Sequence, residues 1–203
     1  MITIVDYGMG NLGSVLNMFK KVGAHAKISS DTEDILKASK ILLPGVGAFD
    51  TAMKCINDSG MKEVLHQKAL VEKIPVLGIC LGMQLLTEGS EEGQLPGLGW
   101  IKGKAFGFKE KIDAQLKVPH MGWNIAEISQ QNALTNNFNG EIRFYFVHSY
   151  FVQVNDKTNS MMRTTYGVEF DSAIVNDNIF GAQFHPEKSH KFGMKLLGNF
   201  AQI

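Results

Sequence analysis

One of the two cysteines in this 203-residue sequence, Cys80, lies between two glycines in the segment Gly78-Ile79-Cys80-Leu81-Gly82. An apolar run precedes the segment, and residues 81–88 have a helical pattern. A strand that runs directly into a helix through glycine, nucleophile and glycine is the elbow of α/β hydrolases. The glycines avoid side-chain collisions around the strained turn, and the helix N-terminus favours a thiolate over a thiol. We therefore predict that Cys80 is a nucleophile, although a free cysteine is more often an inert buried residue.

A nucleophilic cysteine needs a general base, and the base needs a group that orients it. Of the six histidines, His185 fits this role because it follows an apolar strand and precedes Pro186 and Glu187. Pro186 holds the preceding residue extended. In an extended backbone residues i and i+2 point to one side, so Glu187 can bind one imidazole nitrogen while the other faces Cys80. The alternative is a surface His–Glu pair. A metal site is not predicted, because His185 and His190 lack the H-E-x-x-H spacing.

Acyl transfer also needs amide donors for the negatively charged oxygen of the intermediate. The N–H of Leu81, directly after the nucleophile, is one expected donor. The segment Pro44-Gly45-Val46-Gly47 is expected to supply another, because glycines let backbone N–H groups turn into a site. An ordinary turn between a strand and a helix would have a similar sequence.

The elements that must position these residues alternate between strands and helices in the first half of the chain. This alternation predicts an α/β fold with an open, mostly parallel sheet and helices on both faces, in a single domain over residues 1–203. The predicted strands are 2–5, 24–28, 41–43 and 76–79, the third ending at Pro44. The predicted helices are 12–22, 31–38 with Asp31 as its cap, two that begin at Ala48 and Met61, and 81–88.

The second half of the chain predicts antiparallel additions to this sheet. Residues 100–108, 143–154 and 161–165 have the composition of longer strands, and Asp177-Asn178 is typical of a hairpin turn. A last helix from about Ser189 carries apolar residues at helical spacing and is expected to close the core.

Composition excludes several classes of function. Lys plus Arg and Asp plus Glu each count 20, so no basic surface is expected for nucleic acid or for a membrane. The N-terminus lacks the pattern of a signal peptide, and no apolar run is long enough to span a membrane. We expect a soluble cytoplasmic protein. Two cysteines cannot form a disulfide framework, and Cys55, which lacks glycine neighbours and a base, is assigned no function.

The segment Gly8-Met9-Gly10-Asn11-Leu12-Gly13 matches the dinucleotide fingerprint G-x-G-x-x-G between a predicted strand and helix. A turn of this kind also occurs in α/β sheets that bind no nucleotide. Because the chemistry around Cys80 is the stronger signal, NAD binding is the less favoured interpretation, and no cofactor is predicted.

Three segments resemble the nucleophile, oxyanion and base motifs of the class I (triad) glutamine amidotransferases: GICLGMQ at 78–84, PGVG at 44–47 and FHPEKS at 184–189. Residues 6–12, 119–124 and 145–150 are similar to the glutaminase subunits of imidazole glycerol phosphate synthases. The similarity covers essentially the whole chain. It implies that Cys80 attacks the side-chain amide of L-glutamine. It also implies that His185, oriented by Glu187, protonates the departing ammonia before water hydrolyses a glutamyl thioester.

The resemblance also implies roles for residues that spacing alone does not assign. The oxyanion would meet Leu81 with Val46 or Gly47. Residues that would hold glutamine are Gln84, His148, Ser149 and Tyr150, and residues in motifs near a subunit interface are Asn11, His120 and Trp123. For Trp123, core packing is the alternative. In this family the ammonia passes to a separate (β/α)₈ barrel cyclase, which makes imidazole glycerol phosphate and AICAR in histidine biosynthesis, so a partner subunit is expected.

Three alternatives remain open at this point. The chain could supply ammonia for amidation of a surface-sugar precursor, since His190-Lys191-Phe192 follows the base motif where a smaller residue is more usual. It could be a non-catalytic module that only docks a partner, which the complete triad opposes. It could also be a free-standing cysteine hydrolase such as a peptidase, which Gln84 and the interface-like motifs oppose.

Overall fold

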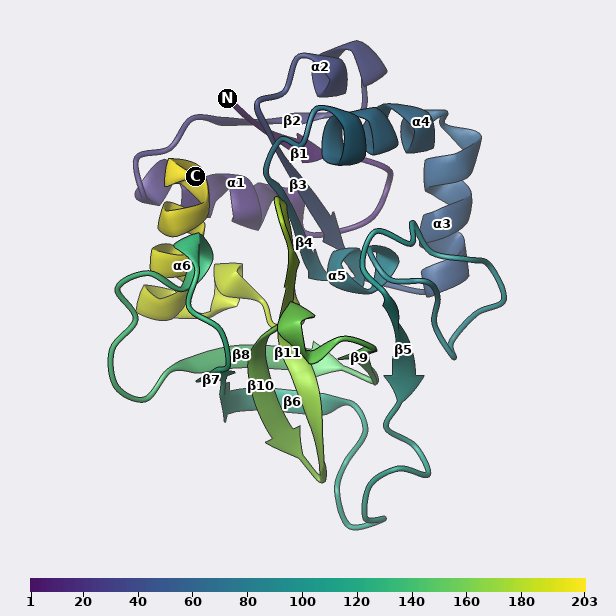
Figure 1. Ribbon diagram of the computed structural model, residues 1–203, viewed down its shortest axis with the longest axis vertical. Coiled ribbons are helices and arrows are strands. Elements are labelled where there is room, and N and C mark those ends of the chain that lie inside the picture. The colour runs from purple at the N-terminus through teal and green to yellow at the C-terminus, as the bar shows by residue number, and fades with distance from the viewer.

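The computed structural model describes residues 1–203 and contains a ten-stranded mixed sheet and a separate two-stranded sheet (Figure 1). The main path of the large sheet has the order β2-β1-β3-β4-β12-β11-β10-β7. The first five of these strands are parallel, and the last three continue antiparallel. In sheet order they span Ala26–Ser29, Ile2–Val5, Lys40–Gly45, Val76–Cys80, Ile179–Ala182, Val168–Asn176, Ser160–Tyr166 and Glu127–Ile128. The predicted α/β class with antiparallel additions is confirmed.

Helices cover both faces of the parallel part. One buried cluster lies under α1 (Leu12–Lys21) and α6 (His190–Gln202), and another lies under the remaining helices. Those helices are α2 (Thr32–Leu36), α3 (Phe49–Asp58), α4 (Met61–His66), continued by a π-helical turn (Gln67–Val71), and α5 (Leu81–Leu85). The central strands contribute to the two clusters in alternation, because successive side chains of a strand point to opposite faces. No helix has the length and apolar character needed to cross a membrane.

The prediction of one strand over residues 143–154 is wrong. The chain forms β8 (Arg143–His148) and β9 (Tyr150–Val154), which are separated at Ser149 and join different sheets. Strand β9 pairs with β5 (Gly103–Gly107) and β11, whereas β8 pairs with β6 (His120–Ile125) in the two-stranded sheet. Sequence analysis did not predict β6, because its outward side chains are apolar and hide the alternation of a half-buried strand.

Several predicted boundaries shift by a few residues, and two of these shifts lie beside Cys80. Strand β3 continues through Pro44 to Gly45, opposite Ile79 and Cys80 of β4. A proline is tolerated there because the pairing of β3 with β1 ends earlier, at Leu42, so no ladder partner needs its N–H. Helix α5 ends at Leu85 rather than at residue 88, since the following backbone bonds to residues 97–103 instead.

Three short 3₁₀ turns complete the fold: Ala133–Thr135, Lys157–Asn159 and Pro186–Lys188. The predicted hairpin turn at Asp177-Asn178 is confirmed, with Asp177 at φ 51°. Because β3, β4 and β12 are parallel neighbours, their carboxyl ends meet at one edge of the sheet. In open α/β sheets that edge is where ligands bind, and it carries the candidate site.

Candidate active site

Cys80 is the last residue of β4 and immediately precedes α5. Its backbone has φ 54° and ψ −110°, a strained conformation for a residue with a side chain. Such strain is common at functional sites, where it aims a side chain out of the regular pattern of the strand. The predicted nucleophile elbow is therefore present in the backbone.

The two flanking glycines leave room for this turn, but they do so against different neighbours. A Cβ at Gly78 would lie 2.6 Å from the carbonyl oxygen of Gly82, across the turn, as predicted. A Cβ at Gly82 would instead lie 1.8 Å from the carbonyl oxygen of Leu43 on the adjacent strand. Gly82 is thus required by the close packing of α5 on β3 and not by the elbow alone.

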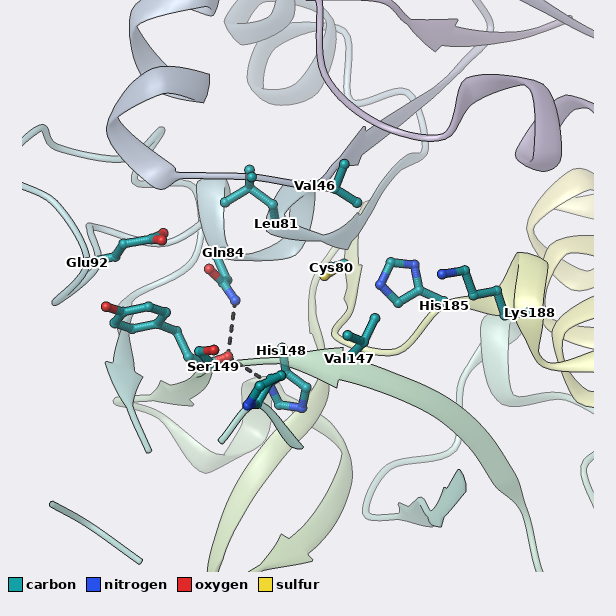
Figure 2. A pocket seen from close by; sticks show the side chains of 13 residues that line it. Val46, Cys80, Leu81, Gln84, Glu92, Val147, His148, Ser149, His185 and Lys188 are labelled. Atoms are coloured by element: carbon teal, nitrogen blue, oxygen red, sulfur yellow. Dashed lines mark hydrogen bonds between the residues drawn. The ribbon is translucent and has the colours of Figure 1, made fainter. Parts of the chain in front are cut away.

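His185 follows β12 and has extended backbone angles, whereas Pro186 begins a 3₁₀ turn. This turn, not a continuous extended chain, brings Glu187 back to the imidazole. Oε1 of Glu187 lies 2.7 Å from Nδ1 of His185, and both side chains are only 3 % exposed. The other ring nitrogen, Nε2, is buried without a further hydrogen-bond partner, and the ring lies beside Cys80 (Figure 2).

The surroundings of His185 favour its charged form. Burial alone would lower its pKa, but interactions with Cys80 and Glu187 outweigh burial and raise the pKa from 6.5 to about 10. His185 is therefore an imidazolium near neutral pH, held between the Cys80 sulfur and the Glu187 carboxylate. A cysteine, a proton carrier and an orienting carboxylate form the arrangement needed for nucleophilic acyl transfer.

Cys80 and His185 open into a cavity of about 410 Å³. Its size is in the range of small-molecule sites. Figure 2 shows Cys80 near the middle of the cavity, with Glu92 at one end and Lys188 at the other. The lining residues are Val46, Gly47, Cys80, Leu81, Gln84, Glu92, Pro119, Val147, His148, Ser149, Tyr150, His185 and Lys188. They include two residues of the predicted triad, Cys80 and His185, whereas Glu187 is recessed behind the wall. They also include every predicted oxyanion and glutamine-binding residue.

Gln84 is held firmly at the wall of this cavity. It is 4 % exposed, and its Nε2 donates to the carbonyl oxygen of Tyr150 at 3.1 Å and to Oε1 of Gln183 at 3.2 Å. Both hydrogens of the amide nitrogen are thus used within the protein. The carbonyl oxygen of Gln84 points toward the end of the cavity that holds Glu92 (Figure 2), where it can accept a hydrogen bond from a ligand.

His148 was predicted to hold substrate, but both of its ring nitrogens are occupied within the protein. Nδ1 lies 2.7 Å from the carbonyl oxygen of Tyr150, and Nε2 lies 2.9 Å from Nδ1 of His120. A carbonyl oxygen can only accept, so His148 carries its proton on Nδ1 and His120 donates to its Nε2. Burial lowers the pKa of His148 to about 3 and that of His120 to about 4, so both rings are neutral. The His148 ring therefore supports the cavity wall and has no nitrogen left for a ligand.

The loop after β3 faces Cys80 across the cavity. Gly47 has φ 114°, a conformation that favours glycine, and Val46 is 46 % exposed. The N–H of Leu81 is in the first turn of α5, where it has no intrahelical acceptor. The predicted oxyanion residues thus lie together on one side of the nucleophile.

The glycine-rich N-terminal segment packs against that same loop. The buried Tyr7 hydroxyl donates to the carbonyl oxygen of Pro44, and a Cβ at Gly10 would lie 3.3 Å from the Pro44 side chain. A Cβ at Gly47 would collide with the Met9 side chain at 2.5 Å. The close backbone approach that its glycines permit is used within the protein, so the fingerprint pattern needs no nucleotide to explain it.

Glu92 is a cavity residue that sequence analysis missed. Its Oε2 accepts a hydrogen bond from the N–H of Phe49 at 2.9 Å, which fixes the carboxylate at the start of α3. Residues 86–102 contain no regular element, so their pattern could not place any side chain. The only signal was an acidic pair, Glu91-Glu92, in a glycine-rich loop, and a solvated surface would produce the same sequence.

The three residues predicted near a subunit interface have different surroundings. Asn11 is exposed and caps α1 by accepting from the N–H of Ser14. Trp123 is 46 % exposed on β6, so core packing of this residue is wrong, and its ring stacks on that of His190 at 5.6 Å. His120 is only 2 % exposed on the opposite face of β6, so it cannot contact a partner directly.

Comparison with known proteins agrees with this geometry. The model of the family "Glutamine amidotransferase class-I" matches residues 3–203. The chain belongs to this family. A protein of Methanococcus maripaludis named imidazole glycerol phosphate synthase subunit HisH 2 is 54 % identical, over 98 % of each chain. A protein of the same name from Pseudomonas aeruginosa is 48 % identical, over 100 % of each chain.

A solved structure of PurLQS from Thermotoga maritima shares the fold of this class I glutamine amidotransferase. Its TM-score is 0.73 at 19 % identity, over 99 % of this chain and 97 % of the other. At that identity the likeness is evidence of the fold alone. The predicted family is thus confirmed by the matched model and by full-length relatives.

Proposed function

We propose that this class I glutamine amidotransferase is the glutaminase subunit of an imidazole glycerol phosphate synthase. In this proposal Cys80, His185 and Glu187 hydrolyse L-glutamine to glutamate and ammonia, and the ammonia passes to a separate (β/α)₈ barrel cyclase subunit. The observation that carries the proposal is the buried His185–Glu187 pair beside a strained cysteine that opens into a cavity. The names of full-length relatives support the choice of acceptor. A biosynthetic subunit of this kind would work in the cytoplasm.

In the proposed reaction the Cys80 thiolate attacks the side-chain carbonyl carbon of glutamine. The carbonyl π electrons move to the oxygen, which the N–H groups of Leu81 and of the Val46–Gly47 segment would stabilise. The imidazolium of His185 gives its proton to the amide nitrogen as the C–N bond breaks, so ammonia leaves and a thioester remains. Neutral His185 then takes a proton from water, which attacks the thioester, and Cys80 leaves as the thiolate.

The cavity suits the amino-acid end of glutamine as well as its amide. With the amide carbon at Cys80, the α-ammonium group would extend toward the carboxylate of Glu92 and the carbonyl oxygen of Gln84. Glu92 would supply the opposite charge, and Gln84 would accept a hydrogen bond. Ser149 and Tyr150 would close the remaining wall.

A partner surface is proposed beside the cavity. Four apolar side chains in the loop before β6 and along its outer face are 37–61 % exposed: Val118, Met121, Trp123 and Ile125. Exposed apolar patches on soluble proteins are typical of subunit interfaces. Pro119, within this stretch, also lines the cavity, so a barrel subunit docked here would lie next to the released ammonia.

Substitution of the nucleophile tests the catalytic part of the proposal. With the cyclase subunit present, Cys80→Ala and Cys80→Ser should abolish release of glutamate from glutamine, whereas Cys55→Ser should leave it unchanged. A diazoketone analogue of glutamine should label Cys80, as shown by peptide mass spectrometry. Glutaminase activity in the Cys80→Ala complex would refute the triad, and a failure to label would support a docking module.

The choice of acceptor has its own test. Trp123→Ala should weaken binding of the cyclase about tenfold or more, because a large aromatic contact is lost. Met194→Ala, which shortens an exposed side chain on α6, should leave binding unchanged. Glutamine-dependent turnover with the matched cyclase supports the histidine pathway. The names of both relatives described above end in the number 2, which marks them as one of several forms of the subunit. A sugar-amidating partner is therefore the second candidate. Turnover with that partner alone would replace the first.

A further inference from the structure

Gln183 is a buried polar residue to which the sequence and the proposed mechanism assign no role. It directly follows β12 and has 0 % exposure. Strand β12 runs parallel to β4 with Ala182 opposite Ile79, so the next residue lies beside Cys80. Because side chains alternate along a strand, Gln183 shares the face of Gly181, which packs against Met83 of α5. A buried amide in this position needs hydrogen-bond partners, because burial removes it from water.

The hydrogen bonds of Gln84 determine which way the Gln183 amide points. The carbonyl oxygen of Tyr150 can only accept, so the group of Gln84 that lies 3.1 Å from it is the amide nitrogen. The same nitrogen lies 3.2 Å from the Gln183 side chain, which must therefore present its oxygen. The amide nitrogen of Gln183 is then directed to the sulfur of Cys80, at 3.7 Å.

The Tyr150 carbonyl is itself fixed by a second donor. Nδ1–H of His148 points to it, His120 donates to His148, and Nδ2 of Asn124 lies 3.2 Å from Nε2 of His120. The oxygen of the Asn124 amide accepts from the N–H of Ile125, which confirms that its nitrogen faces His120. Every hydrogen bond in this network, from Asn124 to the Tyr150 carbonyl and from Gln84 to Cys80, thus has one donor and one acceptor. The orientation assigned to the Gln183 amide is consistent with all of them.

We propose that Gln183 is a further catalytic residue, whose amide N–H donates a hydrogen bond to the Cys80 sulfur. The proposal rests on the proposed role of Cys80 as the nucleophile. An N–H donor binds a thiolate more strongly than a thiol, because the acceptor carries the charge. The bond stabilises the sulfur before it attacks, and again when the C–S bond of the thioester breaks and the electron pair returns to sulfur. The proton stays on the amide nitrogen throughout.

Alkylation of Cys80 by iodoacetamide measures this effect without glutamine. In a Cys55→Ser background, where Cys80 is the single thiol, Gln183→Met keeps the size of the side chain but removes the donor. Alkylation at pH 7 should be about three- to tenfold slower, because the thiolate loses a hydrogen-bond donor that stabilises it. Ser172→Ala is the control. Ser172 lies next to Gln183, because its backbone carbonyl accepts from the backbone N–H of Gln183. The substitution removes only a buried hydroxyl that has no hydrogen-bond partner, so it should not change the rate.

Equal alkylation rates in the Gln183→Met and parent proteins at pH 7 would overturn the proposal. If Cys80 of the parent reacts no faster at pH 7 than cysteine in a short peptide, the proposed function fails instead. If Gln183→Met does not fold, a second measurement uses the protein that keeps Gln183, namely the ¹⁵N–¹H signals of its side-chain amide. These should move when Cys80→Ala removes the sulfur acceptor, and unchanged signals would also overturn the proposal.

Discussion

Nδ1 of His185 lies 2.7 Å from Oε1 of Glu187, and the pair is almost completely shielded from water. The 3₁₀ turn that begins at Pro186 folds the chain so that residues two apart meet on one side. In a buried site the carboxylate fixes both the orientation of the ring and the nitrogen that carries the first proton. The second proton is then on the nitrogen that faces Cys80.

Replacement of Glu187 by glutamine should lower kcat for glutamine hydrolysis about a hundredfold or more. The glutamine side chain at position 187 has the same size as glutamate but cannot stabilise the imidazolium of His185. The proton carrier is therefore lost while the cavity stays open. Steady-state release of glutamate in the presence of the cyclase measures the effect, with Glu63→Gln on exposed α4 as the control. A tenfold change in KM with kcat preserved would instead assign Glu187 to substrate binding.

The raised pKa of His185 predicts how stability depends on pH. The folded protein holds the proton up to a pKa of about 10, whereas the unfolded chain releases it near 6.5. The stabilisation is therefore complete below about pH 6.5 and is lost as the pH rises through about 10. Between these values the free energy of unfolding, measured with urea, should fall more steeply for the parent protein than for His185→Gln. Parallel curves would show that His185 is not protonated in the folded state.

Glu92→Gln should raise KM for glutamine about tenfold and leave kcat nearly unchanged. The new amide oxygen can still accept from the N–H of Phe49, so the loop is retained while the charge opposite the ammonium group is lost. Glu91→Gln is a close control, because that neighbouring carboxylate pairs with Lys111 outside the cavity. A change in kcat without a change in KM would argue against the proposed ammonium site.

Gly82→Ala should destabilise the fold by about 2–3 kcal/mol, since its Cβ would lie 1.8 Å from the carbonyl oxygen of Leu43. Gly13→Ala, in α1, meets no atom within 4 Å and should stabilise the helix by about 0.5–1 kcal/mol. Thermal and urea unfolding of the two variants measure both effects. Equal stability of the two variants would mean that α5 can move away from β3 without cost.

Local patterns were sufficient for the parallel half of the fold. Strand and helix periodicity placed β1, β4 and α1. Asp31 was correctly predicted to cap α2, and in the structure its side chain accepts from the N–H of Glu33. The glycines around Cys80 indicated the elbow because that turn is made by neighbouring residues. Such features depend on interactions within a few residues, and these are visible in a sequence.

Contacts between distant segments could be read only from the tertiary structure. The break at Ser149 sends β8 and β9 to different sheets, and the choice depends on partners that lie up to about 50 residues away in the chain. Glu92 lines the cavity because its carboxylate binds the N–H of Phe49 at the start of α3. Gln183 lies beside Cys80 because β12 pairs with β4.

The sequence by itself determined the chemistry, a cysteine in an elbow with a His-x-Glu partner. The tertiary structure decided which polar groups surround that chemistry and which way they point. His148 illustrates the difference: the family resemblance implied that it holds glutamine, but burial keeps its ring neutral, and both ring nitrogens are used by Tyr150 and His120. Hydrogen-bond direction in a buried network is set by all its members together, and no single segment of the chain contains them all.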